Sequence, residues 1–159
     1  MKNFTHLNPA DQPAMVDVGQ KKVTYRIARA RATVRVTDEI LNLLEADDIK
    51  TKKGSVFQTA IIAGVMAAKK TGELIPLCHP VGMDNCQIEI IVNAQNEIQI
   101  DCLASVHAKT GIEMEAMTGA SVAALTIYDM CKAFSHDIVI KEVKLMEKRG
   151  GKRDFMRKK

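Results

Sequence analysis

The chain has 159 residues, of which 47% are hydrophobic and 26% are charged, a balance typical of one globular domain and unlike that of a disordered segment. Its formal net charge of +4 favours anionic partners without identifying one. The four cysteines, at 78, 86, 102 and 131, form no Cys-x-x-Cys pair, which argues against a zinc or iron–sulfur centre, and the polar start of the chain favours the cytoplasm over export.

The first part of the chain predicts an arm, a long strand and a helix. Residues 1–21 are rich in Asn, Pro, Asp, Gln and Gly, which predicts an irregular N-terminal arm. From Lys22 to Val36 the side chains alternate in character, which predicts a strand with a bulge near residues 28–30. Thr37-Asp38 resembles a helix N-cap, and the apolar spacing that follows predicts helix through Leu44.

The middle of the chain predicts a second helix and then a loop. A polar, basic break at 50–54 precedes a helical pattern over 55–70, in which Gly64 and several alanines permit close approach of a neighbouring element. Thr71-Gly72 is expected to end this helix. Residues 75–84, with two prolines, are expected to form a loop.

The last part predicts a hairpin, a long helix and a final strand. The two hairpin strands are expected at 86–93 and 98–106, with the turn at 94–97. The helix is expected at 113–135 and the final strand at 138–146.

The order strand, helices, strand, strand, helix, strand predicts an α+β fold of the ferredoxin-like kind, in which a four-stranded antiparallel sheet carries its helices on one face. We expect three segments: the arm at 1–21, the folded domain at 22–147 and a basic tail at 148–159. The strands are so rich in Ile, Val and Cys that we expect some of these side chains to point away from the helices, where self-association would cover them.

The loop around Leu77-Cys78-His79-Pro80 is the first candidate for chemistry, because prolines on both sides stiffen the backbone around an imidazole that can exchange a proton near neutral pH. A structural or merely exposed histidine stays open as an alternative. Cys78 is a weaker candidate nucleophile, since nothing in the sequence indicates a thiolate.

The expected long helix carries a candidate at each end. At its start, Glu113, Met114 and Glu115 lie beside free backbone N–H groups, although acidic residues also suit a helix N-terminus without any function. Near its end, Asp129 and Lys132 are three residues apart and can pair on one face. Because most of the helix is small and apolar, we expect this pair to be buried and its pKa values to be tuned for acid–base work, with a structural ion pair as the alternative.

Two basic loops are candidates for binding phosphates. Lys53 precedes Gly54, and Lys148 and Lys152 flank Gly150-Gly151, where the backbone can approach an anion closely. Alternatively, either loop is a solvated turn that binds no phosphate.

Residues 109–133 read KTGIEMEAMTGASVAALTIYDMCKA, and residues 75–80 read IPLCHP. Both segments closely resemble the signatures of the cyclic pyranopterin monophosphate synthase family, molybdenum cofactor biosynthesis protein C. Phe4–Asn8, Met15–Val18, the Lys53-Gly54 break, Ala63-Gly64 and Gly150–Lys152 match the family in the same order, so that the resemblance covers essentially the whole chain.

The resemblance implies a lyase that converts 3′,8-cyclo-7,8-dihydro-GTP to cyclic pyranopterin monophosphate and releases pyrophosphate. It also implies a ferredoxin-like subunit in a homohexamer, a trimer of dimers with shared active sites, and a transient contact with the upstream radical-SAM enzyme. No ligand cluster in the sequence demands a metal or cofactor, and we expect none beyond Mg²⁺ that can accompany the substrate phosphates.

Carried over by position, the resemblance implies catalytic roles for four residues, namely Asp129, Lys132, Lys53 and His79. It implies substrate contacts for eight residues, namely Leu77, Cys78, His79, Met114, Glu115, Glu113, Lys148 and Lys152.

The chain departs from the family pattern in the tail, where Arg153 alone stands between Lys152 and Asp154 and the family usually has Ser-Gly. Two other classes of function stay open from the residues themselves. A basic sheet can bind RNA, but the alternating strands lack the stacking aromatics of such modules. The second alternative is a purely structural partner of the radical-SAM enzyme. Such a protein would form no pterin from the purified cyclised substrate.

Overall fold

The computed structural model describes residues 10–158, so Phe4–Asn8 and the start of the expected arm lie outside the described residues. The elements in chain order are β1 (Thr24–Arg35), α1 (Asp38–Leu41), β2 (Leu44–Glu45), β3 (Asp48–Thr51), β4 (Gly54–Ser55), α2 (Val56–Lys69), α3 (Thr71–Leu74), β5 (Asn85–Val92), β6 (Ile98–Ala108), α4 (Glu113–Cys131), β7 (Val139–Arg149) and β8 (Phe155–Met156). None of the helices in this range is long and apolar enough to span a membrane.

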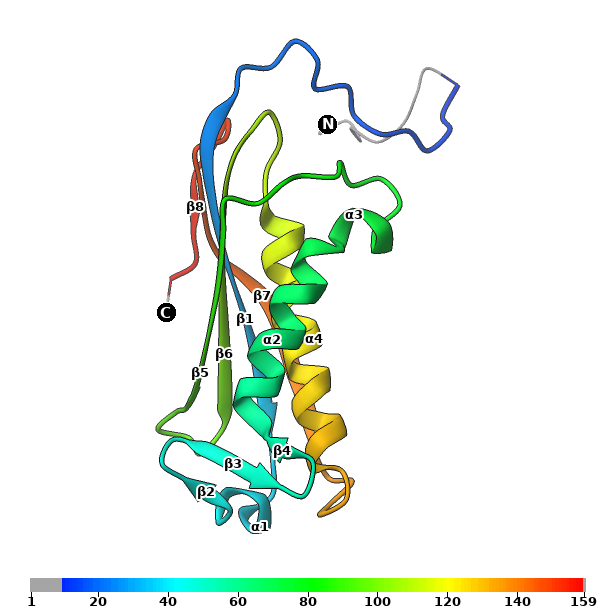
Figure 1. Ribbon diagram of the computed structural model, residues 1–159. Coiled ribbons are helices and arrows are strands. Elements are labelled where there is room, and N and C mark those ends of the chain that lie inside the picture. Colours follow the sequence, from blue (N-terminus) through cyan, green and yellow to red (C-terminus); the bar gives the residue numbers. More distant parts are fainter. Residues whose placement is uncertain (1–9, 159) are drawn as a thin grey trace.

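The main sheet has the order β5-β6-β1-β7-β8, with every neighbouring pair antiparallel. The predicted α+β class is confirmed. The sheet has five strands where four were predicted, because the chain turns back after β7 and adds the two-residue strand β8 at one edge. Figure 1 shows α2 and α4 side by side on one face of this sheet, with the N-terminal arm and the loop after α3 near the same end.

The helices approach the sheet closely because the contact surfaces are built from small residues. Ala28, Ala30 and Ala32 of β1 are fully buried beneath them. Where α2 and α4 cross, an added Cβ on Gly64 would lie 2.8 Å from the carbonyl oxygen of Gly119. The glycines therefore set the separation of the two helices, as the small-residue pattern of residues 55–70 predicted.

The expectation that some apolar strand residues point away from the helices is confirmed in part, because Ile91 of β5 is 43% exposed on the outer face of the sheet, but most of that face is polar or charged. The even-numbered residues of β5 and β6, which include Ile88, Ile100 and Cys102, all point toward the helices and pack in the core. The opposite face carries charge, as in the Arg31–Asp101 pair at 2.8 Å. Strict alternation in these antiparallel strands separates the two kinds of side chain. Other exposed apolar residues lie on the helices, at Ile62, Met66 and Leu125.

Three local expectations were tested between β1 and α2. The predicted bulge is confirmed, with a register shift between Arg29 and Ala30 and another between Thr33 and Val34. The helix expected through Leu44 ends at Leu41, because residues 46 and 47 both have positive φ angles, 49° and 64°, and make a two-residue hairpin turn between β2 and β3. The basic break at 50–54 is part of the same small sheet, β2-β3-β4.

Replacing Gly64 by Ala should lower the free energy of unfolding by about 1–3 kcal/mol, because the new methyl group would press on the backbone of α4. Urea denaturation at one protein concentration measures the change. Gly82→Ala is the matched control, since an added Cβ there meets nothing within 4 Å. Equal stability of the two variants would contradict the close helix crossing.

Candidate functional site

All eight residues to which the resemblance gave substrate contacts line one cavity of about 500 Å³ at the end of the molecule where α4 begins. The loop after α3 supplies Leu77, Cys78 and His79, and the start of α4 supplies Glu113, Met114 and Glu115. Lys148 and Lys152 enter from the end of β7 and the turn that follows. The arm adds Val16, Val18 and Lys21, none of which was predicted as a site residue. We call this cavity the loop pocket.

Local contacts hold the walls of the loop pocket together. The N–H of Cys78 donates to the carbonyl oxygen of Ile75 at 3.0 Å and closes a turn before His79. Gly72 lies against Pro80, where an added Cβ would be 3.1 Å from the proline Cα, so the loop folds back on the start of α3. The ammonium of Lys148 pairs with Glu113 at 2.9 Å and ties β7 to α4.

Glu115 is a buried carboxyl group in the wall of the loop pocket, with only 4% of its surface exposed. Burial raises its pKa above the ordinary value, and the nearby charge of Glu113 adds to the effect. Burial also raises the pKa of the Cys78 thiol, with further contributions from Glu115 and Glu113. A thiol of raised pKa stays protonated at neutral pH, which disfavours Cys78 as a nucleophile.

A second cavity of about 420 Å³ adjoins the loop pocket and shares Lys148, Lys152 and Lys21 with it. We call it the basic cleft, because seven of its thirteen lining residues are Lys or Arg and one is acidic. Arg26 and Lys109 belong to its wall and were missed as site residues. Arg26 was missed because a charged residue in an alternating strand looks like part of a solvated face.

The remaining candidates meet at the far end of α4. The carboxylate of Asp129 pairs with the Lys132 ammonium at 2.7 Å and with the Lys53 ammonium at 3.2 Å. Lys53 also donates to the Asp129 carbonyl oxygen at 3.3 Å. The predicted Asp129–Lys132 pairing is therefore present, and Lys53 reaches it from the β3–β4 turn. We call these three residues the lysine–aspartate cluster.

Asp48 positions the turn that carries Lys53. Its carboxylate accepts hydrogen bonds from the Ser55 hydroxyl and from the N–H of Phe57 at 2.8 Å, which fixes the small sheet to the first turn of α2. Burial opposes ionisation of Asp48, but these hydrogen bonds outweigh it and hold its pKa below the ordinary value. No sequence pattern indicated this role of Asp48.

The expectation that Asp129 and Lys132 are buried was wrong. Their side chains are 56% and 49% exposed. Asp129 lies in the last turn of α4, and Lys132 follows directly after the helix as its C-cap. The hydrogen bond from Lys132, then that from Lys53, lowers the pKa of Asp129, and the bond to Asp129 raises the pKa of Lys132. Both groups are therefore held charged in the single chain and are not tuned toward neutrality.

His79 does not meet Asp129 within one chain. Glu113, in the loop pocket, and Asp129 are sixteen positions apart along α4, a length of about 24 Å at the rise of an α-helix. Figure 1 shows the two ends of α4 at opposite ends of the molecule. The four proposed catalytic residues thus divide into one group of three and the separate His79.

No group of three or more His, Cys, Asp or Glu side chains that could hold a metal ion occurs among residues 10–158. The charged side chains that line the two cavities in this part of the chain are mainly Lys and Arg, which suit anions.

Comparison with known proteins gives consistent matches. The family model described as the MoaC family matches residues 15–151. A protein of Xanthomonas campestris pv. campestris (strain B100) named cyclic pyranopterin monophosphate synthase is 51% identical over 152 residues, which cover 96% of this chain and 92% of that protein. A Synechocystis sp. protein named molybdenum cofactor biosynthesis bifunctional protein is 50% identical over 155 residues, 95% of this chain and 45% of that protein.

Glu115→Gln should make the protein more stable than the wild type at pH 8 and leave it similar at pH 4. With its pKa raised in the folded state, Glu115 is protonated in both states below the ordinary value of 4.5, whereas at pH 8 the folded state must bury a charge. The wild type therefore loses stability relative to the variant as pH rises. Urea denaturation at both pH values measures this difference.

The same change at the exposed Glu45 controls for the substitution itself. A Glu115→Gln protein that is less stable than the wild type at pH 8 would show that the carboxylate has a partner that offsets its burial.

Proposed function

The chain belongs to the MoaC family, and we propose that its loop pocket and its lysine–aspartate cluster together make cyclic pyranopterin monophosphate. The protein is a lyase of molybdenum cofactor biosynthesis that converts 3′,8-cyclo-7,8-dihydro-GTP to the cyclic product and releases pyrophosphate. The observation that carries this proposal is the joint placement of eight expected substrate-contacting residues around one cavity. Non-catalytic and RNA-binding functions have no comparable support.

The loop pocket suits a purine-derived substrate with a phosphate chain. Its lining combines apolar side chains with the buried Glu115, which in either protonation state offers hydrogen bonds to the polar edge of a base. Lys148 and Lys152 at its rim suit the phosphates. His79 orients the substrate or relays a proton. Any Mg²⁺ would be held by the substrate phosphates rather than by the protein.

The charge states of the lysine–aspartate cluster suggest a division of roles. Asp129, which its lysine partners keep ionised, is a carboxylate that accepts a proton as the five-membered ring of the purine opens. Lys132, an ammonium group, donates one as the pterin ring closes. A substrate hydroxyl then attacks the α-phosphorus, the bond to the β-phosphate breaks, and lysine ammonium groups neutralise the departing pyrophosphate.

The distance between the two groups requires a second subunit. A two-fold axis that crosses α4 midway, between Ser121 and Val122, would place Asp129 of one subunit beside Met114 of the partner subunit. The exposed Leu125, Ile62 and Met66 on the helix layer would supply apolar contact area there. We propose this arrangement as the repeating dimer of a homohexamer built as a trimer of dimers.

The finer description of the fold follows from the strand order. Without the edge strand β8 the order is β5-β6-β1-β7, which supports a ferredoxin-like subunit. We further propose that the protein works in the cytoplasm and meets the upstream radical-SAM enzyme transiently, when the cyclised nucleotide is passed on.

Asp129→Asn and Lys132→Ala should each lower kcat by about 10²–10⁴-fold, because each removes a proton-transferring group. Incubation of each protein with purified cyclised nucleotide, followed by detection of pyrophosphate and of the oxidised, fluorescent pterin, measures turnover. Asp137→Asn, a change at an exposed aspartate just beyond α4, is the control. Full activity of either variant would refute the assigned roles.

Mixing two inactive variants should restore activity if the sites are shared. A subunit carrying Asp129→Asn and a subunit carrying His79→Ala would together form one intact site in each mixed dimer. Random reassembly after gentle denaturation should therefore recover about a quarter of wild-type activity. Each variant refolded alone is the control, and no recovery in a mixture shown to contain mixed dimers would refute the shared site.

A further inference from the structure

Two of the four thiols lie next to each other on the inner face of the sheet. Cys86 is in β5 and Cys102 is in β6, two register positions apart, because Cys102 lies opposite Ile88 and Cys86 lies opposite Ala104. Their Sγ atoms are 3.9 Å apart. Neither residue lines the loop pocket or belongs to the lysine–aspartate cluster, so the proposed function uses neither thiol.

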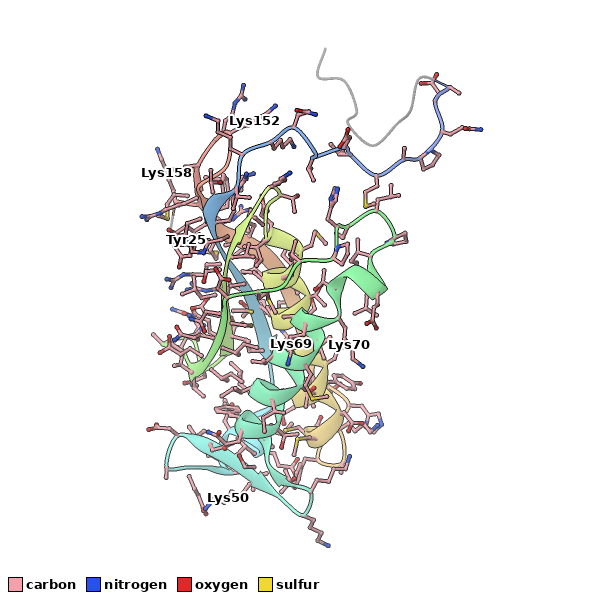
Figure 2. All side chains as sticks on the ribbon, turned by 45° about the horizontal axis from the view of Figure 1, so that its top comes forward. Tyr25, Lys50, Lys69, Lys70, Lys152 and Lys158 are labelled. Carbon is pink, nitrogen blue, oxygen red and sulfur yellow. The ribbon has the colours of Figure 1, made fainter. Side chains whose placement is uncertain are left out.

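The two thiols differ in their access to solvent. Cys102 is fully buried, and its sulfur packs against α4, where an added Cβ on Gly119 would lie 2.8 Å from it. Cys86 is only partly buried and lines a cavity of about 400 Å³. The end of α2 supplies Lys69 (Figure 2) and Val65 to the same cavity. A small solute can therefore reach Cys86, whereas Cys102 is shielded.

The contact between the sulfur atoms makes the two thiols chemically different. Their hydrogen bond, together with burial, raises the pKa of Cys102, which is therefore the donor. The same hydrogen bond stabilises a thiolate at Cys86 and, against the effect of burial, lowers its pKa. Burial instead raises the pKa of Cys78, and raises that of Cys131 to about 11. Because the thiolate is the reactive form, we expect Cys86 to be the most nucleophilic of the four cysteines.

The position of β5 in the sheet allows the two sulfur atoms to approach each other. Bonded sulfur atoms are about 2 Å apart, so the present separation of 3.9 Å must close by about 2 Å. β5 is an edge strand that pairs only with β6, so no strand on its other side resists a small shift. Cys102 is confined by Gly119, and Cys86 therefore makes most of the movement.

We infer that Cys86 and Cys102 form a reversible oxidation site, in which a hydroperoxide oxidises Cys86 and Cys102 then closes a disulfide bond within the subunit. This site goes beyond the proposed function and does not rest on it. Its two thiols combine the features of a redox-sensing pair, one reactive and accessible and the other buried beside it.

The chemistry balances with hydrogen peroxide as the oxidant. The Cys86 thiolate attacks one peroxide oxygen, the O–O bond breaks, and the departing hydroxide takes up a proton to become water. The Cys102 sulfur then attacks the sulfur of the Cys86 sulfenic acid, the S–S bond forms, and a second water leaves. Two thiols thus lose two electrons and two protons, and one peroxide is reduced to two waters. A dithiol reductant restores both thiols by exchange.

Peptide mapping of the full-length protein after treatment with hydrogen peroxide tests the inference. The remaining thiols are blocked with an alkylating reagent under denaturing conditions, and the chain is then cut before its aspartates without reduction. This cleavage places the four cysteines in four separate peptides, residues 48–83, 84–100, 101–128 and 129–136. We expect the second and third peptides to be linked in chains of monomer size, and dithiothreitol to remove the link.

Two variants separate the roles of the thiols. Cys102→Ala keeps a small apolar side chain in the core, and it should abolish the link and leave a sulfenic acid at Cys86 that dimedone traps. Cys131→Ala removes another buried cysteine and is the matched control, which should form the link as the wild type does. In the wild type, Cys86 should be oxidised at least about tenfold faster than Cys78.

The inference would be overturned by a wild-type protein that forms no such link, or that links Cys86 only to another chain. Oxidation of Cys78 or Cys131 ahead of Cys86 would overturn it as well. The wild-type measurement decides even if Cys102→Ala fails to fold. Turnover of the cyclised nucleotide plays no part in this test, so the failure of either proposal leaves the other standing.

Discussion

The structure depends on α4, a straight, closely packed helix whose length fixes where all the candidate chemistry lies. Small residues along its inner face, such as Gly119 and Ala123, let it rest directly on the sheet and on α2, so it cannot bend or shift without losing the core. Its first turn closes the loop pocket, and its last turn carries Asp129. The helix therefore keeps the loop pocket and Asp129 about 24 Å apart within one chain.

The two ends of α4 differ in electrostatic character. At the first end, Glu115 is buried in a cavity and its raised pKa favours the neutral acid. At the other end, Asp129 is exposed and its two lysine partners keep it ionised. The first environment suits recognition of a largely uncharged ring system, and the second suits charged groups that exchange protons. The two ends of α4 therefore provide complementary environments, one buried and the other charged.

The sequence predicted most of the elements, because β1, β5, β6 and α4 have strong periodic patterns and well-marked ends. It did not predict the β2–β3 hairpin, whose turn uses Ala46 and Asp47 at positive φ instead of the usual Asn-Gly, nor the short β8. The Asp129–Lys132 contact followed from helical spacing. The addition of Lys53, the exposure of this cluster and the cations of the basic cleft follow from tertiary structure, which local patterns do not encode.

Exposure of the lysine–aspartate cluster has a consequence for catalysis under the proposed function. In water, an ion pair such as Asp129–Lys132 is screened and moves protons with little assistance from its surroundings. If a partner subunit covers it with the loop pocket, water leaves, and the same charges interact more strongly with each other and with the substrate. Desolvation would then raise the pKa of Asp129 and lower that of Lys132, opposite to the shifts in the single chain. Assembly itself would thus bring the proton-transferring groups toward their working pKa values.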